Sequence, residues 1–113
     1  MEWDGYEWVV RYADFEYNLE REDIRESSFK VAGGRLETKL DAKVMSETEL
    51  WLNGHPGRQI HLKGLNDSRV AVMRFFLVGQ RLYVLGVVSL TKSEVPRDID
   101  RFFSSFKLTP KNQ

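Results

Sequence analysis

Apolar and polar residues alternate along residues 6–17, at the period of two that is typical of a half-buried β-strand. One face of this segment carries four aromatic or β-branched residues, which are Tyr6, Trp8, Val10 and Tyr12. The alternation changes parity toward Phe15 and Tyr17, which predicts a bulge or a bend near Ala13-Asp14.

Two segments show helical rather than strand spacing. Residues 20–41 place an apolar stripe at intervals of three and four, consisting of Phe29, Ala32, Leu36 and Leu40. Gly33-Gly34 interrupts this helix and predicts a kink or a close packing contact. Near the C-terminus a second stripe indicates a second helix, with Pro96 in its first turn and Ser93 as its cap. That stripe consists of Val95, Ile99, Phe102, Phe103 and Phe106.

The middle of the chain predicts antiparallel hairpins. Strands are expected over 43–53 and 58–63 around the turn 53–57, and over 69–78 and 81–90 around Gly79-Gln80. Glycine at the first of two loop residues suits a type II′ turn. The last two strands are apolar on both faces, so they require a covering layer above and below.

These elements predict an α+β fold in which about five antiparallel strands lie between an N-terminal and a C-terminal helix. The 113 residues suit a single domain, 1–113, whose tail, 109–113, is expected to fray. No stretch is apolar enough for a membrane span. No targeting signal is present, so a full-length chain of this sequence is expected to be cytoplasmic.

Composition narrows the chemistry. The chain has no cysteine, which excludes disulfides, thiolate metal sites and a cysteine nucleophile. Its formal net charge is zero, which argues against nucleic-acid binding. Residues 1–50 hold 13 acids and 7 bases, whereas residues 51–113 hold 4 acids and 10 bases. Either the two halves lie together and neutralise each other, or the second half forms a basic face with Arg58, Lys63, Arg69, Arg74 and Arg81.

Three short strings carry a resemblance. Gly54-His55-Pro56-Gly57-Arg58 comes first, then Arg81-Leu82-Tyr83, then Phe103-Ser104-Ser105-Phe106. Their order resembles that of small bacterial domains of unknown function, which look like distant members of the fold shared by the photosystem II protein PsbP and the Ran-binding protein Mog1. The resemblance covers roughly residues 44–108. It implies an antiparallel sheet between helices and a non-catalytic module that helps to assemble or stabilise something else.

Single residues give weaker signals of a site. Arg74 lies on an apolar strand face and could meet a ligand anion or an internal acid. Arg58 follows a glycine-rich turn and could hold an anion or pair with a carboxylate. With Tyr83, these two arginines define a possible small-ligand or anion pocket. Trp51 has the parity opposite to its apolar neighbours and is expected to be an exposed anchor for a partner.

Metal and nucleophile sites have little support in the sequence. The only histidines, His55 and His61, do not make a ligand set, and Ser104-Ser105 lacks a positioned base. No cofactor is expected. We therefore expect a non-enzymatic binding or assembly module with a protein partner, and as the alternative a ligand domain around Arg58, Arg74 and Tyr83. The sequence leaves the oligomeric state open.

Overall fold

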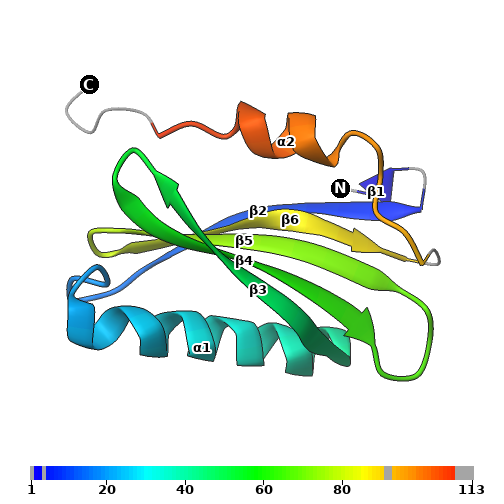
Figure 1. The fold of residues 1–113 in the computed structure, drawn as a ribbon, viewed down its shortest axis with the longest axis horizontal. Coiled ribbons are helices and arrows are strands. Elements are labelled where there is room, and N and C mark those ends of the chain that lie inside the picture. The colour runs from blue at the N-terminus through cyan, green and yellow to red at the C-terminus, as the bar shows by residue number, and fades with distance from the viewer. Residues whose placement is uncertain (1, 4, 91–92, 109–113) are drawn as a thin grey trace.

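A computed structural model shows an antiparallel sheet lying between two helices (Figure 1), which confirms the predicted α+β arrangement. The structure describes residues 2–3, 5–90 and 93–108. The side chains of residues 2–3 and the predicted tail, 109–113, lie outside this description.

The sheet has five long strands and one two-residue strand, in the spatial order β1-β2-β6-β5-β4-β3, and all neighbouring strands are antiparallel. The elements are β1 (Glu2–Trp3), β2 (Tyr6–Asp14), α1 (Glu22–Leu40), β3 (Ala42–Leu52), β4 (His55–Gly64), β5 (Val70–Val78), β6 (Arg81–Ser89) and α2 (Ile99–Ser105). Helix α1 covers one side of the sheet, here called the α1 face, and α2 covers the other, the α2 face.

Strands β5 and β6 form the predicted central hairpin. Each has a strand on both sides, and Gly79 in the turn has a φ of 61°, as its predicted turn position requires. Odd-numbered β5 residues such as Phe75 and Leu77 enter the core under α1, whereas Val72 and Phe76 enter the core under α2. The two apolar parities of this strand therefore serve two separate cores.

Of the bulge or bend predicted near Ala13-Asp14, no bulge occurs, because β2 pairs with β6 in unbroken register through Asp14; the strand ends there, and the chain bends just beyond it at Glu16 and Tyr17. The irregularity lies instead in β3, between Val44 and Ser46. Since a bulge reverses the parity of the strand beyond it, Val44 packs in the core under α1, while Leu50 and Leu52 pack in the core under α2.

Two element boundaries also differ from prediction. The turn expected over 53–57 is only two residues long, because Asn53 and Gly54 both adopt positive φ and β4 begins at His55. The last helix begins at Ile99 rather than near Pro96. Asp98, not Ser93, occupies the cap position, and its side chain makes no cap hydrogen bond.

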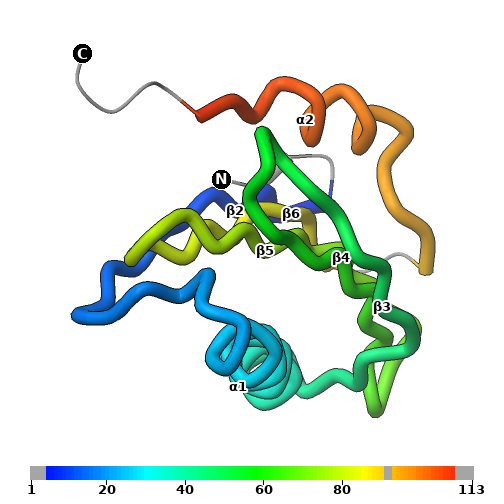
Figure 2. Tube along the Cα trace, turned by 60° about the vertical axis from the view of Figure 1, so that its left-hand side comes forward, coloured from blue at the N-terminus to red at the C-terminus, as the bar shows by residue number. Residues whose placement is uncertain are grey.

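The two helices cover different strands of the sheet. Helix α1 packs on β3, β4 and β5, whereas α2 lies over β6, with Phe102 of α2 against Trp8 of β2 at 4.8 Å between ring centroids. Figure 2 shows α1 and α2 on opposite sides of the twisted sheet. Six strands at a spacing of about 4.8 Å span about 24 Å, roughly twice the diameter of a helix with its side chains. Each face is therefore only partly covered.

Glycine substitutions test this packing. A Cβ at Gly86 would overlap the carbonyl oxygen of Val72 and lie 2.5 Å from Met73 Sδ, whereas one at Gly34 of α1 would meet nothing within 4 Å. We expect Gly86→Ala to lower the free energy of unfolding by about 2–3 kcal/mol through overpacking. Gly34→Ala should raise it by about 0.5–1 kcal/mol through helix propensity. Urea denaturation measures both, and equal effects of the two variants would contradict the packing described.

Candidate functional site

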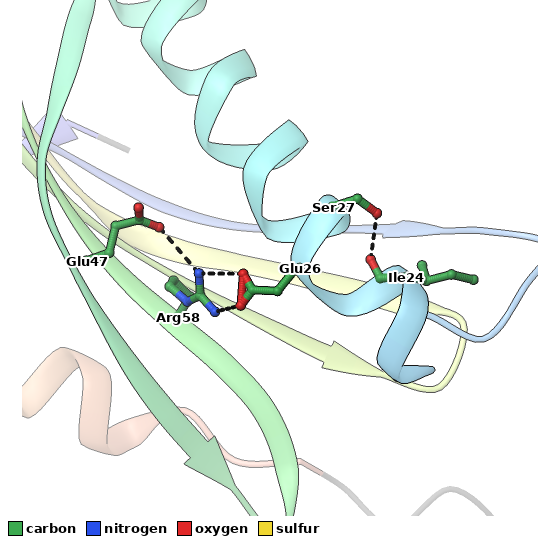
Figure 3. Close-up of polar contacts among 5 residues, drawn as sticks. All are labelled: Ile24, Glu26, Ser27, Glu47 and Arg58. Atoms are coloured by element: carbon green, nitrogen blue, oxygen red, sulfur yellow. Dashed lines mark hydrogen bonds and ion pairs between the residues drawn. The ribbon is translucent and has the colours of Figure 1, made fainter.

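Arg58 of β4 lies on the α1 face, between acids of two other elements (Figure 3). Its Nη2 and Nη1 donate to the two carboxylate oxygens of Glu26 on α1, at 2.5 and 3.2 Å, and Nη1 lies 3.5 Å from Glu47 Oε1 on β3. The guanidinium carbon stands 4.6 Å from the centre of the Phe29 ring. Only 13% of the Arg58 side chain is exposed.

These contacts make Arg58 a connection between the sheet and helix α1. The hydrogen bonds that Arg58 donates to Glu26 are the main cause of two pKa changes: they lower the pKa of Glu26 and raise the pKa of Arg58. Two carboxylates occupy its Nη1 and Nη2 donors, and the remaining donor, Nε, is buried without a hydrogen-bond partner among the described residues, so no outward donor of the guanidinium is left for a ligand anion. Of the two interpretations open from the sequence, the structure supports pairing with a carboxylate.

Arg74 of β5 lies on the opposite side of the sheet. Its Nε donates to Gln59 Oε1 at 2.7 Å, and its guanidinium lies 4.1 Å from the centre of the Phe103 ring on α2. Burial lowers the pKa of Arg74, and the nearby charge of Asp100 only partly opposes this effect. Arg74 thus packs under α2 and makes no ion pair within the part of the chain that is described.

The structure does not bring the predicted pocket residues together. Tyr83 shares the α2 face with Arg74, but its ring packs against Phe106 at 5.4 Å and Tyr12 at 6.5 Å between centroids. Arg58 is separated from both by the sheet. A shared pocket of Arg58, Arg74 and Tyr83 is therefore not formed.

The other residues singled out from the sequence are dispersed. Trp51 is 60% exposed, as its parity predicted, and Arg25 lies 6.0 Å from its ring centre. His55 Nδ1 lies 2.9 Å from Glu20 Oε2, whereas His61 is exposed. The hydroxyls of both helix serines donate to carbonyls three residues earlier in their own helix, Ser104 to Arg101 and Ser105 to Phe102.

The charge asymmetry between the two halves is partly neutralised inside the fold. Besides Arg58, the second-half residue Arg81 pairs with Asp14 of the first half at 2.7 Å and holds the pKa of that carboxyl below its usual range. Arg69 pairs locally with Asp67. Because Arg58 and Arg74 also lie on opposite faces, the proposed basic face does not form.

A groove that the sequence did not reveal runs beside α1. It lies on the α1 face over β6 and β2, next to the strands that α1 covers, and has a volume of about 330 Å³. Its floor is apolar and includes Val9 of β2 with Leu82 and Val84 of β6, all half-buried. Ala32 and Leu36 of α1 form the facing wall. We call this site the lateral groove.

The rim of the lateral groove is basic. Arg11 stands on the β2 side, and Arg35 and Lys39, one helical turn apart, stand on the α1 side. All three side chains are exposed, and none is within ion-pair distance of a carboxylate in the described residues. Glu7 is the one acid on the lining. The groove thus combines an apolar floor with three positive charges that have no ion-pair partner in the described part of the chain.

The corresponding uncovered region of the α2 face has a different composition. There the half of the sheet that α2 leaves open presents Gln59, His61 and Lys63 of β4, and Ser46 and Thr48 of β3. Polar residues at an uncovered position need no partner, whereas the apolar floor of the lateral groove is in contact with water only at a cost in free energy. This contrast marks the lateral groove as the candidate binding site.

Part of the groove was visible in the sequence. Val9 and Ala13 share a parity with Arg11, and Ala32 and Leu36 share a helix face with Arg35 and Lys39. Placing these segments side by side requires the pairing of β2 with β6, a contact across about 75 residues that no local pattern encodes.

Comparisons with known proteins add no family to this description. No family model matches the chain, and no curated protein or solved structure matches it at a significant level. Among the described residues, no group of three or more His, Asp and Glu side chains could hold a metal ion. None of the helices described has the length and apolar character needed to cross a membrane.

Two variants of Arg58 separate packing from charge. Arg58→Ala removes the stem that packs on Phe29 and should cost about 1–3 kcal/mol, whereas Arg58→Met keeps most of that contact and should cost less than about 1 kcal/mol. The paired Glu26 titrates below its usual value of 4.5, so its contribution to stability is present above that pH and is lost as pH falls. The difference between wild type and Arg58→Met should therefore shrink below about pH 4.5. A difference in denaturation midpoint that is constant with pH would contradict the ion pair.

Proposed function

We propose that this domain is a non-enzymatic binding module whose lateral groove holds a single-chain carboxylate amphiphile of the fatty-acid type. One observation carries the proposal: the α1 face is apolar over β6 and β2, where no helix covers it, whereas the part of the α2 face over β3 and β4 that no helix covers is polar. An apolar ligand chain on Val9, Leu82 and Val84 would remove this floor from water.

The basic rim determines the sign of the ligand's charge. Arg11, Arg35 and Lys39 approach the groove from both sides and lack carboxylate partners among the described residues. A carboxylate at the rim would accept charge-assisted hydrogen bonds from them. Their exposed heads remain hydrated, so we assign most of the affinity to the chain and the selectivity for an anion to the rim.

The size of the groove limits the length of the ligand. Its volume of about 330 Å³ is near the lower end of the 300–1,000 Å³ that ligand sites usually occupy. A medium-length chain such as that of dodecanoate suits this space. The alternative pocket around Arg58, Arg74 and Tyr83 is not proposed again, since these side chains already have partners on two faces of the sheet.

We also propose that the fold is PsbP/Mog1-like and that the domain acts within a larger assembly, as the resemblance of its sequence motifs implies. The antiparallel sheet between two helices supports the first part. The exposed Trp51 and the open β2 edge support the second by offering surface to a protein partner.

Dodecanoate, used below its critical micelle concentration, tests the ligand. We expect saturable binding by isothermal titration calorimetry, weaker binding of the uncharged dodecanol, and none of acetate. The double variant Arg35→Glu/Lys39→Glu should weaken dodecanoate binding at least about fivefold, because two exposed ionic contacts of about 0.5–1 kcal/mol each are lost.

A matched control makes the same change in net charge elsewhere. Lys30 lies on the side of α1 away from the groove and Lys43 on β3, and both are exposed. Lys30→Glu/Lys43→Glu should leave dodecanoate affinity within about twofold of wild type, since distant exposed charges are screened.

A steric variant tests the floor of the groove. Ala13 is an exposed position on the lining, and Ala13→Trp should block the alkyl chain of the ligand. Equal losses in the two double variants, or no effect of Ala13→Trp, would refute the site.

A further inference from the structure

The outer edge of β2 has no strand beside it along most of its length. Strand β1 pairs only with Tyr6 and Glu7, and no other described residue pairs with β2 on that side. Trp8 to Asp14 therefore form an open sheet edge, which presents unpaired backbone donors and acceptors to solvent.

The hydrogen-bond alternation of an antiparallel pair shows which residues face that edge. At the two ends of the β2–β6 pairing, the carbonyl of Gly5 accepts from the amide of Leu90 and the amide of Phe15 donates to the carbonyl of Gln80, both at 2.8 Å. Odd-numbered residues thus bond inward to β6. The backbone groups of Trp8, Val10 and Tyr12 consequently point outward.

The side chains on this edge are largely apolar, and several of them are exposed. Val10 is 63% and Tyr12 62% exposed, and the only charge between Trp8 and Ala13 is Arg11. The opposite edge, β3, has features that discourage pairing, namely the bulge after Val44 and the charges of Lys43, Glu47 and Glu49. Within residues 5–90, the β2 edge from Trp8 to Ala13 has no bulge and only one charge.

We infer that β2 pairs antiparallel with β2 of a second copy of this chain, in a two-fold arrangement centred on Val10. The inference does not rest on the ligand proposed for the lateral groove. A two-fold axis perpendicular to the sheet keeps every side chain on its own face, so directly opposed residues must have the same parity. The axis must therefore lie between the two copies of one residue. An axis at Arg11 would oppose two like charges. Because β1 already occupies the edge at Tyr6 and Glu7, an axis at Val9 would leave only Trp8 to Val10 to pair, whereas an axis at Val10 leaves Trp8 to Tyr12.

The register centred on Val10 is self-complementary. It places Trp8 opposite Tyr12 of the partner subunit, an aromatic cross-strand pair on the α2 face. On the α1 face, Glu7 lies diagonal to Arg11 of the partner subunit, within reach of an ion pair. The formal net charge of zero adds no long-range repulsion between copies. The pairing would join two sheets into one continuous sheet. Both lateral grooves would then face the same side of that sheet.

Single cysteines test this register in a chain that has no native cysteine. Across the two-fold axis the two Val10 Cα atoms would lie about 5.5 Å apart, within disulfide range, whereas the two Tyr12 Cα atoms would lie about 14 Å apart. Under oxidised glutathione we expect Val10→Cys to form a covalent dimer and Tyr12→Cys to remain monomeric on non-reducing gels. Both substitutions are at exposed positions, so folding is preserved.

Proline variants test the pairing without a crosslink. Val10→Pro removes an amide that points outward from β2 and breaks no hydrogen bond to β6. The matched control is Glu49→Pro. Alternation in the β3–β4 hairpin, where Trp51 lies opposite Pro56, points the amide of Glu49 outward from the β3 edge. We expect analytical ultracentrifugation of wild type and Glu49→Pro to show a concentration-dependent monomer–dimer equilibrium. Val10→Pro should weaken it at least about tenfold, through lost cross-strand hydrogen bonds. Wild type that stays monomeric into the millimolar range, or Tyr12→Cys that crosslinks as fast as Val10→Cys, would overturn the inference.

Discussion

A six-stranded sheet is about twice as wide as a single helix, and this difference in width determines how the two layers cover the sheet. A sheet about 24 Å across cannot be covered by a single helix of half that width, and each face here has only one helix. The two helices are offset, so α1 lies over β3 to β5 and α2 over β6 and its neighbours. Strand β5 packs under both helices, and Phe75 on its α1 face and Phe76 on its α2 face are accordingly 1% and 4% exposed.

The offset produces two uncovered areas, and the sequence treats them differently. On the α2 face, β4 presents Gln59, His61 and Lys63, as expected for a surface in water. On the α1 face, β6 presents Leu82 and Val84, whose parity would suit a covered strand. A sequence selected only for stability would make this second area polar too. The apolar floor is therefore the feature that motivates the ligand proposed for the lateral groove.

Local patterns were sufficient for the central hairpin, the long helix and the layer on each face. They failed where long-range register decides the outcome. Arg58 and Arg74 illustrate this. In the pairing of β4 with β5, Gln59 lies opposite Arg74, so both face α2. Arg58 is the chain neighbour of Gln59 and therefore faces α1. The bulge between Val44 and Ser46 likewise reversed the faces of Trp51 and Glu47 without a glycine or proline to signal it. The lateral groove required the pairing of β2 with β6, which joins the two ends of the chain.

The offset of α1 is itself fixed by the connection that precedes the helix. After β2, the chain passes the β5–β6 turn, where the amide of Leu19 donates to the Gly79 carbonyl and the Gly79 amide donates to Glu20 Oε2, each at 2.7 Å. Glu20 also lies within hydrogen-bond distance of His55 at the start of β4, and Leu19 is 1% exposed. These contacts place the start of α1 beside β4 rather than beneath β2. The helix cannot slide over β6 without breaking them, so the lateral groove is a consequence of how this connection is anchored.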